Sequence, residues 1–265
     1  MNKQFVGQWA IILGGSSGFG YAAVEKLAAH GMNIAVLYRE TSAADRLLRE
    51  KFARLSAEIG VRIDGYNMNA LEPASRESFL QQFGVHETRR HSVRLLLHSI
   101  ARGNLKPLAD APEADLLTVE DIRFTTYAMS TSLLDWARLL LKEGHFQADA
   151  RIIGLTSEGA HKYWEGYAAV SIAKSTLESL VTYMAVELGK YGLKTNLIQA
   201  GISATPSLRK IPDSERLLEL ATRRNPLGRT TKPEDVAAAI YLLCLDEASW
   251  INGSIIPVDG GEHCR

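Results

Sequence analysis

The sequence is poor in cysteine and lacks the patterns that mark metal, membrane and nucleic-acid proteins. Its 265 residues include two cysteines, Cys244 and Cys264, too few for a disulfide framework, which favours a reducing, cytoplasmic compartment. Seven histidines occur without HExxH or paired-cysteine spacing, so we expect no metal site. We find no apolar run of the length of a membrane span or signal peptide. Thirty basic and thirty acidic side chains cancel, so no net field points to nucleic acid or a membrane.

Apolar runs alternate with amphipathic stretches along the chain. Buried strands are predicted at Trp9–Leu13, Asn33–Tyr38, Arg62–Asn67, Val93–Leu97, Arg151–Leu155, Thr195–Gln199 and Ser254–Val258. Helices are predicted at Tyr21–His30, Leu48–Ile59, Ser75–Phe83, Tyr127–Leu141, Tyr167–Leu188 and Pro233–Leu245. This alternation is typical of a doubly wound, Rossmann-type parallel sheet with helices on both faces. We see no linker or repeat, so residues 1–265 are predicted to form one domain.

Three segments between these elements carry weaker patterns. Residues 104–118 form a looser stretch rich in Ala, Pro and Asp. Residues 203–225 are polar, apolar and basic in turn, and we expect them to form a flap over a substrate. The basic run Arg89, Arg90, His91 is interpreted as a solvated connection.

A glycine-rich turn follows the first strand and precedes the first helix. Glycines let the backbone approach a pyrophosphate, and a helix N-terminus stabilises its negative charge. The turn therefore predicts a dinucleotide site. Its contacts are assigned to Gly14, Ser16, Ser17, Gly18, Phe19 and Gly20.

The end of the second strand indicates which dinucleotide is bound. In such sheets this position meets the adenosine ribose, where an acidic residue selects a free diol. Here Tyr38 is neutral and Arg39 is a bidentate phosphate ligand, so NADPH is favoured over NADH, although Glu40 follows directly. We expect an adenine contact at Asn69, beside Ala70, after the third strand.

Tyr167 and Lys174 lie seven positions apart at the start of a long amphipathic stretch. On a helix this spacing is about two turns, so both side chains share one face, about 10 Å apart along the axis. A phenol beside an ammonium group is suited to donate a proton, and the lysine charge is expected to lower the phenol pKa. Such a pair alone is common on helices; the dinucleotide motif upstream favours the catalytic interpretation.

These features together resemble the short-chain dehydrogenase/reductase family over essentially the whole chain, and most closely its enoyl-acyl-carrier-protein reductases. The motifs that carry the resemblance are Tyr167-x6-Lys174, where ketone reducers have Tyr-x3-Lys, His98-Ser99-Ile100-Ala101, and Ala200-Gly201-Ile202-Ser203-Ala204-Thr205. The resemblance implies cofactor contacts at Ser99, Ile100, Ala101, Gly201, Ile202, Thr205 and Lys174. It also implies an acyl carrier protein as the partner that presents the thioester, and a homotetramer.

The chain departs from the commonest enoyl reductases near the phenol. Ser157 stands where they carry a second tyrosine, and it coincides with the catalytic serine of the broad family. Tyr163, in the segment KYWEGY, resembles a less common branch that uses NADPH. Either Ser157 or Tyr163 is expected to assist at the substrate carbonyl. His98 is interpreted as a hydrogen-bonded core histidine.

The wider spacing of the Tyr167–Lys174 pair has a chemical interpretation of its own. Moving a tyrosine from the fourth to the seventh position before the lysine shifts its Cα by about 4.5 Å along the helix. In an enoyl thioester the charge collects on an oxygen two carbons from the carbon that receives hydride, so a more distant donor fits. We therefore predict NADPH-dependent reduction of a trans-2-enoyl thioester in fatty acid biosynthesis. A carbonyl or hydroxysteroid-type reductase and a cofactor-sensing protein without turnover are the alternatives.

A basic group at Arg209, Lys210, Arg223 and Arg224 flanks the predicted flap. A solvated surface is the simpler interpretation of this group, because exposed charges contribute little binding energy. Docking of an acidic carrier protein is the alternative.

Overall fold

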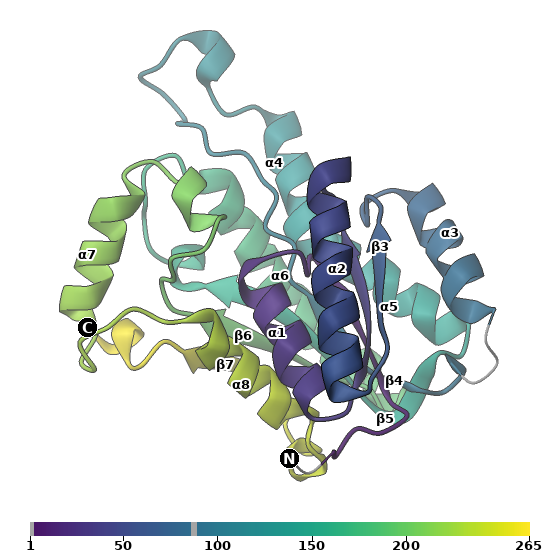
Figure 1. The fold of residues 1–265 in the computed structure, drawn as a ribbon. Helices are drawn as coiled ribbons and strands as arrows, with labels where there is room; N and C mark the ends of the chain where they lie inside the picture. Colours follow the sequence, from purple (N-terminus) through teal and green to yellow (C-terminus); the bar gives the residue numbers. More distant parts are fainter. Residues whose placement is uncertain (1–2, 86–88) are drawn as a thin grey trace.

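Seven parallel strands of the described chain form one sheet, in the order β3-β2-β1-β4-β5-β6-β7 (Figure 1). The computed structural model describes residues 3–85 and 89–265. The strands are β1 Trp9–Leu13, β2 Asn33–Tyr38, β3 Ile63–Asn67, β4 Val93–His98, β5 Phe146–Ser157, β6 Lys194–Ala200 and β7 Ile255–Val258. The main helices are α1 Gly18–Ala29, α2 Ser42–Ile59, α3 Pro73–Gly84, α4 Val119–Thr126, α5 Ser132–Lys142, α6 Ala168–Glu187, α7 Ser214–Arg224 and α8 Pro233–Cys244.

Helices cover both faces of this sheet because its strands are apolar on both sides. On β1, Ile12 belongs to the core beneath α1 and α8, which contribute Val24 and Ile240. Its neighbour Ile11 faces the opposite core, where α5 contributes Trp136 and other side chains come from α3 and α6. Successive strand residues alternate between the two cores, as the pleat requires. The doubly wound α/β prediction is confirmed.

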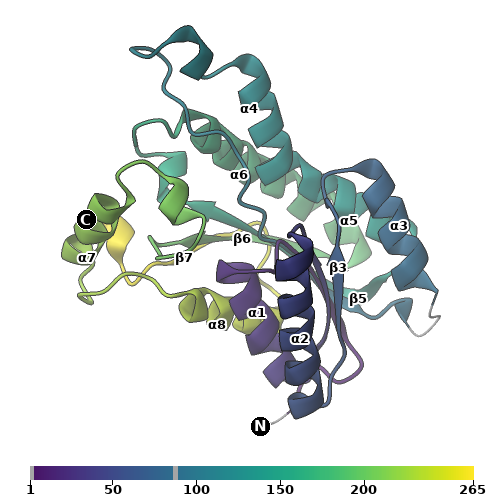
Figure 2. The ribbon, with the colours of Figure 1, turned by 45° about the horizontal axis from the view of Figure 1, so that its top comes forward.

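The two halves of the sheet diverge between β1 and β4. The chain turns from β1 toward β2 on one side, and from β4 toward β5 on the other. Ligands of open parallel sheets bind at such a switch point, at the carboxyl ends of the strands. Here the two loops touch: Ser99 N donates to Leu13 O at 2.8 Å, and a Cβ on Gly14 would lie 2.5 Å from Ser99 O. Figure 2 shows α7 and the segment before α4 beyond this end of the sheet.

The predicted helix Tyr127–Leu141 is part of a longer and less regular unit. A capping box between Thr118 and Asp121 starts α4 at Val119, and the π-helical turn η3 (Tyr127–Thr131) joins α4 to α5. Because the apolar period breaks at the wider π turn, the pattern indicated only the second half.

Several further boundaries differ from the predicted ones, among them the start of α2, which lies at Ser42 and not at Leu48. Strand β5 begins at Phe146, and its pairing with β4 is irregular: Val93 pairs with Phe146, whereas Leu95 pairs with Arg151. The polar residues between Phe146 and Arg151 hid this start. Helix α1 begins at Gly18, inside the glycine turn, so the turn itself supplies the helix N-terminus.

The interpretation of Arg89 as part of a solvated connection is wrong. Its guanidinium lies 4.4 Å from the Trp9 ring centroid and 4.7 Å from that of Phe83, and it donates to Asp64 at 2.7 Å. Burial against two rings and an ion pair makes Arg89 part of the core. Arg90 is exposed, in line with the prediction. Within the described residues, no helix has the length and apolar character to cross a membrane.

Candidate active site

A cavity of about 770 Å³ opens at the carboxyl ends of the strands. Every predicted site residue except Gly20 lines it. These lining residues are Gly14, Ser16, Ser17, Gly18, Phe19, Arg39, Asn69, Ala70, Ser99, Ile100, Ala101, Ser157, Tyr163, Tyr167, Lys174, Gly201, Ile202 and Thr205. No group of three or more metal-ligating side chains occurs in the described part of the chain.

The glycine turn fits a pyrophosphate. Gly14 has φ +88°, and the N-cap Ser17 forms no side-chain bond to the helix backbone. The first turn of α1 carries no acidic residue, so its free N–H groups and dipole are available to an anion. Gly20 has a packing role instead, because an added Cβ would lie 2.1 Å from Gly14 O.

The adenosine end of the cavity is formed by the loops after β2, β3 and β4. Asn67 fixes the backbone after Arg39: its Oδ1 accepts from Glu40 N at 2.9 Å, and its Nδ2 donates to Glu40 O at 3.0 Å. The Asn69 amide donates to Glu72 at 2.7 Å. Sequence reasoning missed both Asn67 and a further arginine here, Arg102, because neither belongs to a recognisable motif.

Tyr167 and Lys174 enter the cavity from α6. Tyr167 occupies the N-cap position, and Lys174 lies two turns further on, with Nζ donating to Leu155 O at 2.7 Å. Gly159 packs against the phenol ring: a Cβ there would lie 2.6 Å from Tyr167 Cε1 and 3.4 Å from Ser157 Oγ. The ring is therefore held between the end of β5 and the start of α6.

The electrostatics of the pair differ from the expectation. Burial raises the pKa of Tyr167, and the Ser157 hydroxyl partly opposes this rise. The predicted lowering of the phenol pKa by Lys174 is wrong, because the pKa of Tyr167 is raised and not lowered. Burial also lowers the pKa of Lys174 to about 8, with Glu178 opposing. Tyr167 thus stays protonated at neutral pH, as a proton donor requires.

Glu178 connects the lysine to the protein surface. It lies one turn after Lys174 and accepts from Thr156 Oγ1 at 2.7 Å; its other oxygen lies 2.6 Å from His161 Nε2. His98, by contrast, is buried with Nε2 2.9 Å from Ser132 Oγ, and burial lowers its pKa to about 3. It is a neutral core histidine, as predicted.

The two predicted assistants of the phenol occupy different environments. Ser157 Oγ is buried and lacks a hydrogen-bond partner of good geometry in the described chain, so it is available to a ligand. Tyr163 stands at the cavity rim and is 88% exposed. Beside it, Trp164 Nε1 donates to Pro212 O of the predicted flap at 3.4 Å.

The predicted flap contains a regular helix, α7, within 203–225. Arg224 at its end is not a solvated surface charge: it pairs with Glu158, and with Glu262 at 2.9 Å. Glu262 is buried, and burial raises its pKa, with Ile202 N and Arg224 opposing. These carboxylates are distant in sequence from Arg224, so no local pattern reveals them. The ion pairs hold α7 over the cavity.

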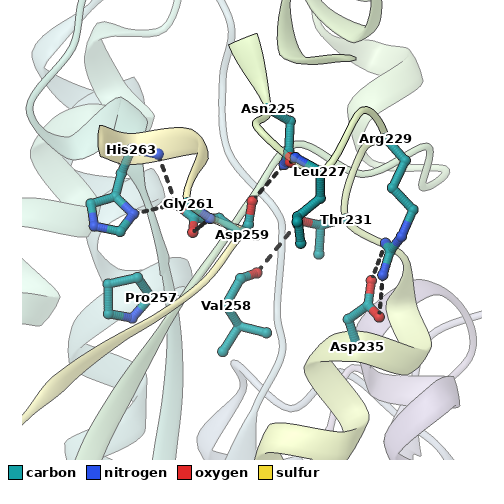
Figure 3. Close-up of a pocket in the computed structure, with 11 residues that line it drawn as sticks. Asn225, Leu227, Arg229, Thr231, Asp235, Pro257, Val258, Asp259, Gly261 and His263 are labelled. Carbon is teal, nitrogen blue, oxygen red and sulfur yellow. Dashed lines mark hydrogen bonds and ion pairs between the residues drawn. The ribbon is translucent and has the colours of Figure 1, made fainter. Parts of the chain in front are cut away.

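A second pocket of about 420 Å³ lies where the flap rejoins the sheet (Figure 3). In it Asn225 Nδ2 donates to Asp259 O at 2.7 Å, and His263 Nδ1 lies 2.6 Å from Asp259 Oδ2. These bonds join the end of α7 to the segment after β7. The residues of this pocket therefore anchor the flap to the sheet.

Comparison with known proteins agrees with this geometry. Residues 14–263 match the family model described as Enoyl-(Acyl carrier protein) reductase. A tropinone reductase homolog from Arabidopsis thaliana is 26% identical over 96% of this chain and 93% of its own. The NADH-type enoyl-acyl-carrier-protein reductase of Aquifex aeolicus is 32% identical over 65% of this chain and 63% of its own.

Among solved structures, the Bacillus cereus enoyl-acyl-carrier-protein reductase with NADP+ and an indole naphthyridinone superposes with a TM-score of 0.87. It is 23% identical and covers 100% of this chain and 99% of its own, so it shows the shared fold. The family match and the cavity together identify the chemistry in broad terms. The chain belongs to the enoyl-reductase-like short-chain dehydrogenase/reductases, which are oxidoreductases that use a nicotinamide dinucleotide.

Proposed function

We propose that this enzyme reduces the carbon–carbon double bond of a trans-2-enoyl thioester with NADPH, as a step of fatty acid biosynthesis. The observation that carries the proposal is the placement of Tyr167 seven residues before Lys174, with both side chains lining one cavity. The position four residues before Lys174, where ketone reducers place the donor, holds Val170. Val170 also lines the cavity and has no proton to give.

In this proposal NADPH would, when bound, supply a hydride to the β-carbon, and a proton from the solvent would then complete the reduction at the α-carbon. Tyr167 donates a hydrogen bond to the thioester carbonyl oxygen, where negative charge develops. Ser157, whose buried hydroxyl lacks a well-aligned partner, adds a second hydrogen bond to the same oxygen. Lys174, which lines the same cavity, would hold the nicotinamide ribose.

The wall of the cavity near Tyr167 supports an acyl substrate. Apolar side chains from four different segments line it, namely Leu105, Met129, Val170, Leu217 and Leu220. An alkyl chain enclosed there loses contact with water, which favours binding by about 0.8 kcal/mol per methylene. Leu217 and Leu220 belong to α7, so the flap helix forms part of this wall.

The test compares two thioesters that differ at the reacting carbons. With NADPH oxidation as the readout, crotonyl thioester should be reduced and acetoacetyl thioester should not. Tyr167→Phe should lose crotonyl reduction and keep nucleotide binding. Reduction of the acetoacetyl thioester alone, or an unimpaired Tyr167→Phe enzyme, would overturn the proposal.

A carbonyl or hydroxysteroid-type reductase is the second candidate. It is favoured by Ser157, which occupies the place of the broad family's catalytic serine and acts on the Tyr167 pKa. The relative named as a tropinone reductase homolog points the same way. Turnover of cyclic ketones with NADPH, without turnover of enoyl thioesters, would select this candidate. Tight NADPH binding without turnover of either class would indicate a sensor.

The expected carrier and assembly remain proposals. Arg209, Lys210 and Arg223 of the predicted basic group are exposed, and Lys210 lines the cavity, so they suit an acyl carrier protein. Ile172, Tyr183 and Val186 are exposed on α6, an apolar set that supports the proposed homotetramer. Light scattering at micromolar concentration would measure the assembly. Carrier docking predicts that added salt weakens turnover of the carrier-linked thioester more than that of a short thioester.

A further inference from the structure

Arg102 brings a second positive charge to the adenosine end of the cavity. It lies in the loop after β4, directly after the His98–Ala101 motif, and lines the cavity together with Arg39. Its guanidinium carbon stands 5.1 Å from the ring centroid of Phe124 on α4. The guanidinium is therefore supported by an aromatic face.

Neither arginine is neutralised by the protein. Within residues 3–85 and 89–265, no carboxylate forms an ion pair with Arg39 or Arg102. Glu40 follows Arg39 and lines the same cavity without pairing with either arginine in the described chain, and Asp45 on α2 accepts from the Tyr38 hydroxyl at 2.7 Å and from Arg49 at 3.0 Å. Asp45 is thus engaged elsewhere and leaves Arg39 free.

The two guanidinium groups act on each other. The pKa of Arg102 is lowered, first by burial and then by the charge of Arg39, with Glu72 opposing. Like charges held at one site disfavour each other, and a bound anion removes that cost. A phosphomonoester carries between one and two negative charges near neutral pH and presents three acceptor oxygens, enough for two guanidinium groups.

We propose that Arg102 and Arg39 together bind the 2′-phosphate of NADPH, so that cofactor choice is set by arginines from the ends of two strands. Arg39 approaches from the end of β2 and Arg102 from the end of β4, the two strands that flank β1. Phe124 acts as a positioning residue that keeps the Arg102 guanidinium directed at the site. The inference rests on the NADPH preference proposed above and holds whichever substrate is reduced.

Calorimetric binding of two nucleotides that lack the nicotinamide tests the inference without turnover. Adenosine 2′,5′-bisphosphate carries the 2′-phosphate and 5′-AMP does not. Arg102→Ala should weaken binding of the bisphosphate about tenfold, the effect of losing one charge-assisted hydrogen bond. Binding of 5′-AMP should change less than about twofold, because that nucleotide presents no group to Arg102.

Further variants separate the two arginines from general effects. Arg39→Ala should resemble Arg102→Ala, and the double variant should bind both nucleotides about equally. Phe124→Leu should weaken bisphosphate binding about threefold, and Phe124→Tyr, which keeps the ring, should restore it. Arg138→Ala, an exposed arginine on α5, is the matched control and should change neither affinity.

The outcomes distinguish this inference from the function on which it rests. An Arg102→Ala enzyme that keeps its preference for the bisphosphate, or loses affinity for both nucleotides alike, overturns the role of Arg102. A wild-type enzyme that binds both nucleotides equally overturns the NADPH preference itself. The thioester assay decides the enoyl reductase proposal separately, since it depends on Tyr167.

Discussion

The two ends of the same sheet use arginine in opposite ways. At the amino end, Arg94 on β4 and Arg151 on β5 are buried and fully engaged. Arg94 donates to Cys244 O at 2.7 Å and to Asp246 at 2.7 Å, and Arg151 donates to Leu243 O at 2.8 Å. At the carboxyl end, Arg39 and Arg102 line the cavity without a carboxylate partner among the described residues.

The difference shows where binding energy is available. The carbonyls that Arg94 and Arg151 bond belong to the last turn of α8, whose groups lack partners within the helix. Hydrogen bonds from Arg151 and Lys194 also hold the pKa of Asp149 well below its usual range, against the opposing effect of burial. These polar groups at the amino end are hydrogen-bonded within the protein. At the carboxyl end, the charges of Arg39 and Arg102 and the buried Ser157 hydroxyl are left for a ligand to bind.

The largest expected effect belongs to the ligand end. Tyr167→Phe removes the proton donor and should lower kcat about a thousandfold, within the usual range for a positioned acid. The melting temperature should stay within about 2 °C, because the ring and its packing on Gly159 are kept. Steady-state kinetics and thermal unfolding measure the two. A large loss of stability would show that the hydroxyl belongs to the folded framework.

At the amino end of the sheet we expect a substitution to lower stability and to leave kcat unchanged. Arg151→Met should lower the free energy of unfolding by about 3 kcal/mol, because it removes one of the partners of Asp149 and leaves the Leu243 and Leu245 carbonyls without their guanidinium donor. Urea unfolding measures the loss. The kcat of the folded fraction should be unchanged. A variant with normal stability and a lowered kcat would show that the amino end of the sheet is not purely structural.

Gly159→Ala tests how closely the framework positions the phenol. The new methyl group would lie 2.6 Å from Tyr167 Cε1, so the ring must move. We expect kcat to fall about thirtyfold with little change in nucleotide affinity, since a displacement near 1 Å misplaces the donor. Gly84→Ala is the control, because its Cβ would meet only ordinary contacts at 3.7 Å. Equal activity of both variants would mean that the ring position is not critical.

The last prediction is a pH dependence, which is small near neutral pH and grows only above pH 8. The pKa of Lys174 is lowered to about 8 by burial, so its positive charge is present below that pH and is lost as the pH rises through it. If the ammonium group holds the ribose, kcat/KM for the dinucleotide should fall about tenfold per pH unit above pH 8. Lys174→Arg should flatten the profile, because a guanidinium stays charged. A flat wild-type profile between pH 7 and 10 would argue against this role.

The parts of the site that depend on local pattern were predictable from the sequence. The glycine turn, Arg39 and the Tyr167–Lys174 pair are each defined by a strand end or a helix spacing, and the structure places all of them around one cavity. The sheet was predictable for the same reason, because buried parallel strands are apolar throughout.

Features that depend on distant partners were not predictable. Arg224 is paired with residues on two other segments, and Arg89 is buried between rings that only the fold brings together. Arg102 carries no motif and gains its meaning from Arg39 and Phe124. For Arg89 and Arg224 the residue type alone suggested a solvated charge, and tertiary contacts showed otherwise.

The loop that carries Arg102 continues without a break into the wall that faces the substrate. Gly103 packs against Thr125, where an added Cβ would lie 2.4 Å from its Cγ2, and Asn104 N donates to Thr125 Oγ1 at 3.0 Å. Leu105 follows and lines the cavity at the wall proposed for the acyl chain. A nucleotide bound to Arg102 would also order Leu105, three residues further on. The substrate site is therefore complete only after the nucleotide has bound. We expect an ordered kinetic mechanism in which the dinucleotide enters first and leaves last, a pattern that product-inhibition kinetics resolves.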